Sequence, residues 1–138
     1  MKNTICATIG MLGSLIASAF GGWSASLTTL LIFMLIDYAT GLLVAGVFHR
    51  SPKTASGGLE SKAGLKGLVR KCMMLLFVLI GHRLDLAVGL TCVRDGVCIA
   101  FMVNELISIV ENAGLMGLPI PSIITNAIEV LKHRNEQK

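Results

Sequence analysis

The sequence has few charged side chains for its length. Of its 138 residues, 14% are charged and 54% are hydrophobic, and the mean hydropathy is +0.76. A soluble domain usually carries about 25% charged residues. A chain this short forms too small a core to hide so much apolar surface. We therefore expect one integral membrane domain, with much of its apolar surface facing lipid.

Motifs for catalysis and metal binding are missing as well. The four cysteines form no C-x-x-C pair, and no histidine stands at metal-ligand spacing from them. The sequence also lacks a nucleophile elbow and a phosphate-binding loop. We therefore expect no enzymatic activity, no metal and no cofactor. We interpret the cysteines as small apolar side chains, and leave open a disulfide between Cys92 and Cys98.

Long apolar segments are what the sequence does contain. Four of them can be drawn, at residues 4–20, 25–48, 68–90 and 93–115. As a helix the second is ~35 Å long, enough to cross a hydrocarbon layer of ~30 Å. The third and fourth carry charges, so they can span only if those groups face protein or an interface. The first is short and rich in Gly, Ala and Ser, so it could span, lie in the interface or be a cleaved signal peptide. The fold class predicted is all-α, with three or four transmembrane helices.

The connector between the second and third segments is strongly basic. Residues 49–71 contain one acid and half of the twelve Lys and Arg residues. The basic residues are Arg50, Lys53, Lys62, Lys66, Arg70 and Lys71. The Gly, Ser and Pro content of the connector predicts a loop over residues 49–67, with at most a short basic helix near Leu65 to Lys71. The positive-inside rule places this connector in the cytoplasm. We expect this loop to contact anionic lipid. The net charge of +4 then reflects membrane topology and not nucleic-acid binding.

The last segment has a different character. Pro119 and Pro121 end the fourth segment. Residues 121–134 then place apolar side chains such as Ile124, Ile128 and Leu131 on one face at helical spacing. This pattern predicts an amphipathic cytoplasmic helix that lies on the membrane or on its own bundle.

Two of the apolar segments contain polar groups that require shelter. A carboxylate at the centre of a spanning helix costs ~2.5–3.5 kcal/mol on insertion scales. Asp37 stands at such a position, and Thr40 and Gly41 share its helix face. Asp85 follows His82 and Arg83 near the end of the third segment, where we expect it close to the outer membrane face.

The fourth segment has a polar stripe. Two acids, two amides and a hydroxyl share one broad side of the predicted helix: Asn104, Glu105, Ser108, Glu111 and Asn112. In lipid such a stripe must be buried against protein or line water. We interpret it, together with the polar residues of the other segments, as a seam between helices and between subunits of a homo-oligomer.

Several stretches together resemble a known family. These are "IDYATGLLVAG", the basic "SKAGLKGLVRK", and "FMVNELISIVENAGLMGLPIP" before the terminal helix. From about Gly21 to Leu131 the sequence is similar to the phage lysis and toxin-secretion holins of Gram-positive bacteria and their phages, a group that includes the clostridial toxin-secretion holin. The resemblance implies about three spanning segments in the host cytoplasmic membrane. It also implies oligomerisation into lesions through which an endolysin or a large toxin leaves the cell.

Two other functions stay open on the residues alone. A small proton-coupled transporter would use Asp37 or Glu105 as its ionisable group and would form oligomers of fixed size. A regulatory, antiholin-like membrane subunit would form no pore and would leave the membrane potential intact.

Overall fold

The computed structural model describes residues 1–137, except the side chain of Asn135, and within these residues it contains helices and no strand. The helices are α1 (Lys2–Ala19), α2 (Ala25–Gly46), α3 (Ser61–Val88), α4 (Val93–Leu115) and α5 (Ser122–Glu136). The predicted all-α class is therefore confirmed.

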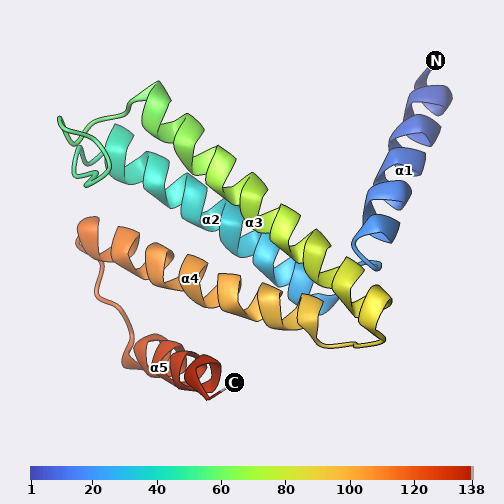
Figure 1. Cartoon of the computed structure of the whole chain (residues 1–138). Helices are drawn as coiled ribbons and strands as arrows, with labels where there is room; N and C mark the ends of the chain where they lie inside the picture. Colours follow the sequence, from blue (N-terminus) through green and yellow to red (C-terminus); the bar gives the residue numbers. More distant parts are fainter. Residues whose placement is uncertain (138) are drawn as a thin grey trace.

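Helices α2, α3 and α4 run side by side and form a bundle (Figure 1). Helix α4 packs most extensively on α2, less on α3, and α2 and α3 share the smallest contact. The apolar core lies toward the end where α2 begins and α3 ends, and its buried members are Leu27, Leu30, Met34, Met74, Val78 and Cys98. Figure 1 places the residue 47–60 loop at the opposite end, which we call the loop end.

The buried positions recur in steps of three and four residues. On α2 they include Leu27, Leu30, Met34 and Asp37, and on α3 they are Met74, Val78, Gly81 and Asp85. This spacing keeps one stripe of a helix facing its neighbours, as in coiled-coil packing. The stripe therefore carries polar residues inward together with the apolar ones.

Helix α1 projects away from the bundle (Figure 1). Its one buried residue is Ala17. The short turn after it brings the chain to α2, whose first turn is capped by Ser24: the Leu27 N–H donates to Ser24 Oγ at 3.1 Å.

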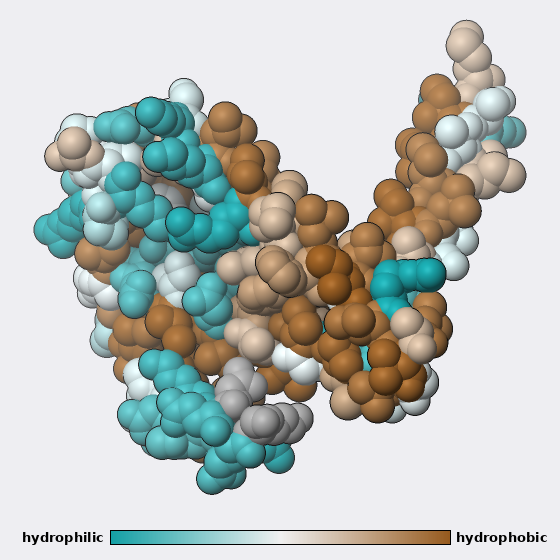
Figure 2. All heavy atoms as spheres, viewed as in Figure 1, coloured by the Kyte–Doolittle hydropathy of each residue, from teal (hydrophilic) through white to brown (hydrophobic). Residues whose placement is uncertain are grey.

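The surface is divided between apolar and polar regions. Figure 2 shows hydrophobic residues over α1 and the adjoining end of the bundle, and hydrophilic residues at the loop end and on α5. Large apolar side chains such as Ile32, Leu35, Leu76 and Phe77 are exposed on α2 and α3. Among the helices of residues 1–137, Ala25–Gly46 alone combines the length and hydropathy needed to span a membrane. Three or four spanning helices therefore remain a prediction.

The predicted loop over residues 49–67 is too long, because α3 already begins at Ser61. Gly64 and Gly67 suggested a loop in the sequence, but they lie inside α3 and face Tyr38 of α2. A Cβ atom would lie 3.4 Å from the Tyr38 hydroxyl oxygen at Gly64, and 3.8 Å from the Tyr38 ring at Gly67. Both glycines therefore lie at ordinary van der Waals distance from Tyr38 and do not interrupt α3. Lys66, Arg70 and Lys71 lie in helix, as the short basic helix expected near Leu65 to Lys71 predicts, and Lys62 is helical as well.

Helix α5 turns back and lies against α4 (Figure 1). Its Ile128 is buried. Leu131 and Arg134 line a cavity of about 530 Å³ together with Phe33 of α2 and Met102 of α4. Helix α5 thus contacts its own bundle, and its contact with the membrane stays a prediction.

Candidate functional site: a charged cluster inside the bundle

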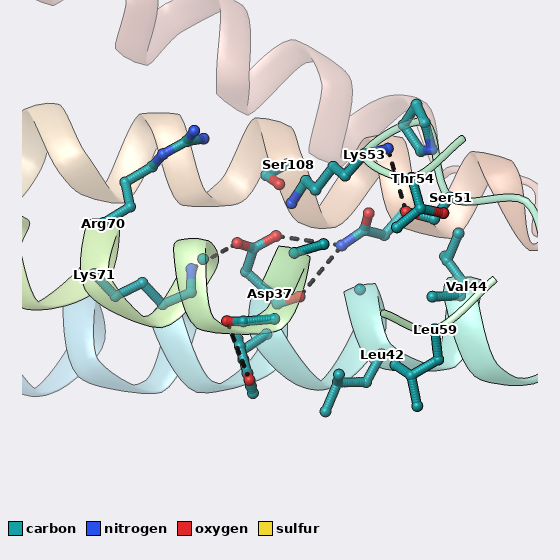
Figure 3. Close-up of a pocket in the computed structure, with 18 of the residues that line it drawn as sticks. Asp37, Leu42, Val44, Ser51, Lys53, Thr54, Leu59, Arg70, Lys71 and Ser108 are labelled. Atoms are coloured by element: carbon teal, nitrogen blue, oxygen red, sulfur yellow. Dashed lines mark hydrogen bonds and ion pairs between the residues drawn. The ribbon is translucent and has the colours of Figure 1, made fainter. Parts of the chain in front are cut away.

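One side chain from each bundle helix meets in a charged cluster. The Lys71 ammonium of α3 donates to Asp37 Oδ2 of α2 at 2.6 Å and to Glu105 Oε2 of α4 at 2.5 Å. The Asp37 and Glu105 side chains are 8% and 3% exposed, and Lys71 is 13% exposed. Figure 3 shows Asp37 and Lys71 pointing toward each other. These ion pairs join α2, α3 and α4 away from bulk water.

An amide on α4 completes the cluster. Asn112 Nδ2 donates to Asp37 Oδ1 at 3.2 Å, to the Asp37 carbonyl oxygen at 3.3 Å and to Thr40 Oγ1 at 2.9 Å. The Thr40 hydroxyl donates in turn to the Ile36 carbonyl at 2.8 Å. Both carboxylate oxygens of Asp37 therefore have a donor, as buried polar groups require.

A cavity of about 110 Å³ adjoins the cluster. It lies between the three helices and the loop, and its lining includes Gly41, Asn104, Ser108, Lys53 and Arg70. In Figure 3 the labelled loop residues Ser51, Lys53 and Thr54 lie on one side and Arg70 on another. The cavity thus extends from the cluster to the residues of the loop.

The structure brings together four of the residues singled out in the sequence: Asp37, Thr40, Glu105 and Asn112. Gly41 and Ser108 line the adjoining cavity. Asn104 also lines it, although it is an exposed residue. Glu111 is exposed and takes no part in the cluster.

Asp85 lies apart from this cluster, at the other end of the bundle. Its two carboxylate oxygens accept from the backbone N–H groups of Val93 at 2.9 Å and Arg94 at 3.0 Å. Asp85 therefore caps the N-terminus of α4 from the neighbouring helix, where a negative charge is favourable. This cap is a role that the sequence did not predict, and a place for Asp85 in the membrane-embedded seam stays a prediction.

The same end is tied to the turn before α2. Arg94 Nη1 donates to the Phe20 carbonyl at 2.7 Å and to the Gly22 carbonyl at 3.4 Å. Arg94 also forms an ion pair with Asp95 at 3.3 Å. The turn between α1 and α2 is thereby fixed to the beginning of α4.

Sequence reasoning placed Lys71 in the wrong setting. It grouped Lys71 with the basic connector, whereas its ammonium lies in the cluster. Its position held the signal, because Lys71 precedes Met74 by three residues and Val78 by seven, on the buried stripe of α3. Lys53, Lys62, Lys66 and Arg70 are exposed. Arg50 donates to the Leu115 carbonyl at the end of α4, at 3.5 Å, where a cation is favourable.

The cysteines have no covalent partner in the structure. Cys98 is buried in the apolar core, whereas Cys6, Cys72 and Cys92 are exposed, and all four are free. The disulfide between Cys92 and Cys98 that the sequence left open is therefore not formed.

An all-helical chain with an apolar exterior and charges buried between its helices is typical of small helical membrane proteins. A model of the bacteriophage holin family matches residues 14–133, most of the chain. The chain belongs to the bacteriophage holin family. Membership agrees with a location in the cytoplasmic membrane and with a protein that is not an enzyme.

Relatives of this chain include proteins of bacteria and of a phage. An uncharacterized protein of Halalkalibacterium halodurans is 38% identical over 88% of this chain and 89% of its own length. An uncharacterized protein of Clostridium perfringens is 33% identical over 97% of this chain and 96% of its own. A probable holin of Bacillus phage phi105 is 31% identical over 81% of this chain and 78% of its own. No solved structure matches the chain.

Proposed function

We propose that this protein is a holin: it accumulates in the cytoplasmic membrane, oligomerises and forms lesions that release an endolysin or a large toxin. Timed lysis of the host, or secretion, is the result. Family membership supports this function. The observation that carries it is the charged cluster of Asp37, Lys71 and Glu105, buried between helices whose outer surfaces are apolar.

The cluster supports a protein with two packings. Buried charges are tolerated when they are paired and hydrogen-bonded, so a single chain can shelter Asp37 and Glu105 from lipid. If helices of many copies pack together instead, the same groups can line water in a lesion. The change requires the three helices to separate at the cluster, and no covalent bond opposes it.

Controlled expression in a bacterium tests the function. We expect growth to continue for a fixed interval after induction and then to stop abruptly, together with loss of membrane potential. A co-expressed endolysin should lyse the cells only after that moment. A transporter would give a gradual, substrate-dependent proton flux, and a regulatory subunit would leave the potential intact. Either result would exclude the proposed function.

We also propose that the exposed basic residues hold the loop end at the cytoplasmic surface through anionic lipid. Lys62, Lys66 and Arg70 are the residues to neutralise, because Lys71 belongs to the cluster. Changing these three residues to Gln should weaken retention of the loop end in the cytoplasm, read from a reporter fused within residues 47–60. The matched control is Lys132→Gln on α5. An unchanged reporter signal in the triple variant would remove the basic residues from this role.

A further inference from the structure

The cluster contains two carboxylates and one ammonium group. We propose that Lys71 is a latch that holds the closed bundle together, and that Glu105 is a surplus negative charge that weakens this closed state. The inference rests on the proposed function and specifies which residues set the timing of lesion formation. It assigns opposite effects to two residues that bond to each other.

The position of Lys71 makes it the latch. Helices α2 and α3 share the smallest contact within the bundle, so few other interactions join these two helices directly. The Tyr38 hydroxyl donates to the Gly64 carbonyl at a long 3.4 Å. Lys71, by contrast, bonds at short range to both α2 and α4. Withdrawal of its ammonium would therefore break the ion pairs that join α3 to both neighbours toward the loop end.

The two acids are not equivalent. Asp37 accepts from Lys71 through Oδ2 and from Asn112 through Oδ1, so two side chains stabilise it. Within the described residues, Glu105 accepts from Lys71 alone. With Glu105 uncharged, Lys71 and Asp37 would form a neutral ion pair that keeps its amide partner. Glu105 is thus the carboxylate whose charge the cluster leaves uncompensated.

Other charged groups near the cluster do not restore the balance. Arg70 of α3 and Lys53 and Glu60 of the loop line the adjoining cavity, and all three are exposed. Water and salt screen their charges more strongly than those of the buried groups. The imbalance inside the bundle therefore persists, at a site where low polarity increases the repulsion between two carboxylates.

Opposite shifts in lysis time follow. Lys71→Met leaves two buried carboxylates without a cation, so the closed bundle loses stability and lysis should begin earlier, by about twofold or more. Glu105→Gln keeps a hydrogen-bond acceptor for Lys71 and removes the surplus charge, so lysis should be delayed by a similar factor. Lys132→Met and Glu129→Gln on α5 are the matched controls, because both residues are exposed and lie outside the cluster. Both controls should leave the time unchanged.

A third variant separates charge from shape. Asp37→Asn, Lys71→Met and Glu105→Gln together remove every charge of the cluster while keeping its volume. If unpaired charge causes the early lysis of Lys71→Met, the triple variant should lyse the cells later than Lys71→Met does. An immunoblot should check the membrane level of each variant. If the Lys71→Met protein fails to accumulate in the membrane, the lysis times of Glu105→Gln and of the triple variant test the latch without it. The same order should hold for unfolding of the purified proteins in detergent.

The outcomes distinguish the latch from the proposed function. If the unaltered protein never collapses the membrane potential, the proposed function fails, while the order of unfolding still tests the latch. If the unaltered protein acts on time but Lys71→Met and Glu105→Gln shift lysis in the same direction, the latch is overturned and the function stands. Glu105→Gln without a delay, or a triple variant as early as Lys71→Met, also overturns the latch.

Discussion

The two ends of the bundle compensate buried carboxylates by different means. At one end, Asp85 accepts from two backbone N–H groups of α4, whose positions are fixed by the helix backbone. Toward the loop end, Asp37 and Glu105 depend on one flexible lysine side chain from a third helix. The first arrangement has one stable geometry, whereas the second exists only while three helices keep their relative positions. Stability and adaptability are thus placed at different ends of the same helices.

The largest expected effect is a difference in chemical labelling between the two ends of the bundle, which we expect to lie on opposite sides of the membrane. Cys92 is exposed in the turn between α3 and α4, and Ala55 is exposed in the loop. In a chain without the other cysteines, a membrane-impermeant maleimide added to intact cells before lysis should label Cys92. The variant Ala55→Cys, with Cys92 also replaced, should be labelled only after permeabilisation. Labelling of both positions in intact cells would show that the ends do not lie on opposite sides.

Removal of the Asp85 cap should have the next largest effect. Asp85→Ala leaves the first two N–H groups of α4 without their acceptor, which should lower the free energy of unfolding by about 2 kcal/mol. Denaturation in detergent micelles, followed by circular dichroism, measures the loss. Asp95→Ala is the control, because its ion pair with Arg94 is partly exposed and should contribute less than about 1 kcal/mol. Equal losses would contradict a specific cap at Asp85.

The smallest effects should come from replacing one glycine of α3 at each end by alanine, and the two changes in stability should have opposite signs. A Cβ atom at Gly81 would lie 3.1 Å from Arg94 Cα and 3.3 Å from its N atom, and this main chain cannot easily move. Gly81→Ala should therefore lose about 1 kcal/mol of stability, despite its better helix propensity. At Gly67 the nearest atom would be 3.8 Å away, so Gly67→Ala should gain about 0.5–1 kcal/mol. The same unfolding measurement tests both, and shifts of one sign would contradict the comparison.

Most of the helix positions could be predicted from the sequence. Helix α4 has the predicted bounds and α2 begins at the predicted residue, because polar turns interrupt the apolar runs there. The start of α3 could not be predicted, since Gly64 and Gly67 have the composition of a loop. Both glycines lie within α3 and pack against Tyr38, which lies more than twenty residues earlier in the chain.

Every member of the cluster except Lys71 was predictable as a polar group that requires shelter. Asp37, Glu105 and Asn112 were identified because a polar residue within an apolar run has few acceptable environments. Lys71 was misassigned because it adjoins other basic residues, and its two partners are each 34 residues away. The cap at Asp85 was missed for a related reason: its partners are backbone groups, which have no signature in the sequence.

The cap on α4 has a mechanical consequence. With its first turn held at Asp85, α4 can tilt as a rigid lever about that point. Glu105 lies twelve residues beyond Val93, or about 18 Å along the axis. A tilt of about 10° would then displace Glu105 by about 3 Å, while the pivot itself hardly moves. This displacement is larger than the 2.5 Å distance between the Lys71 ammonium and Glu105 Oε2. A small tilt of α4 is therefore sufficient to break this ion pair.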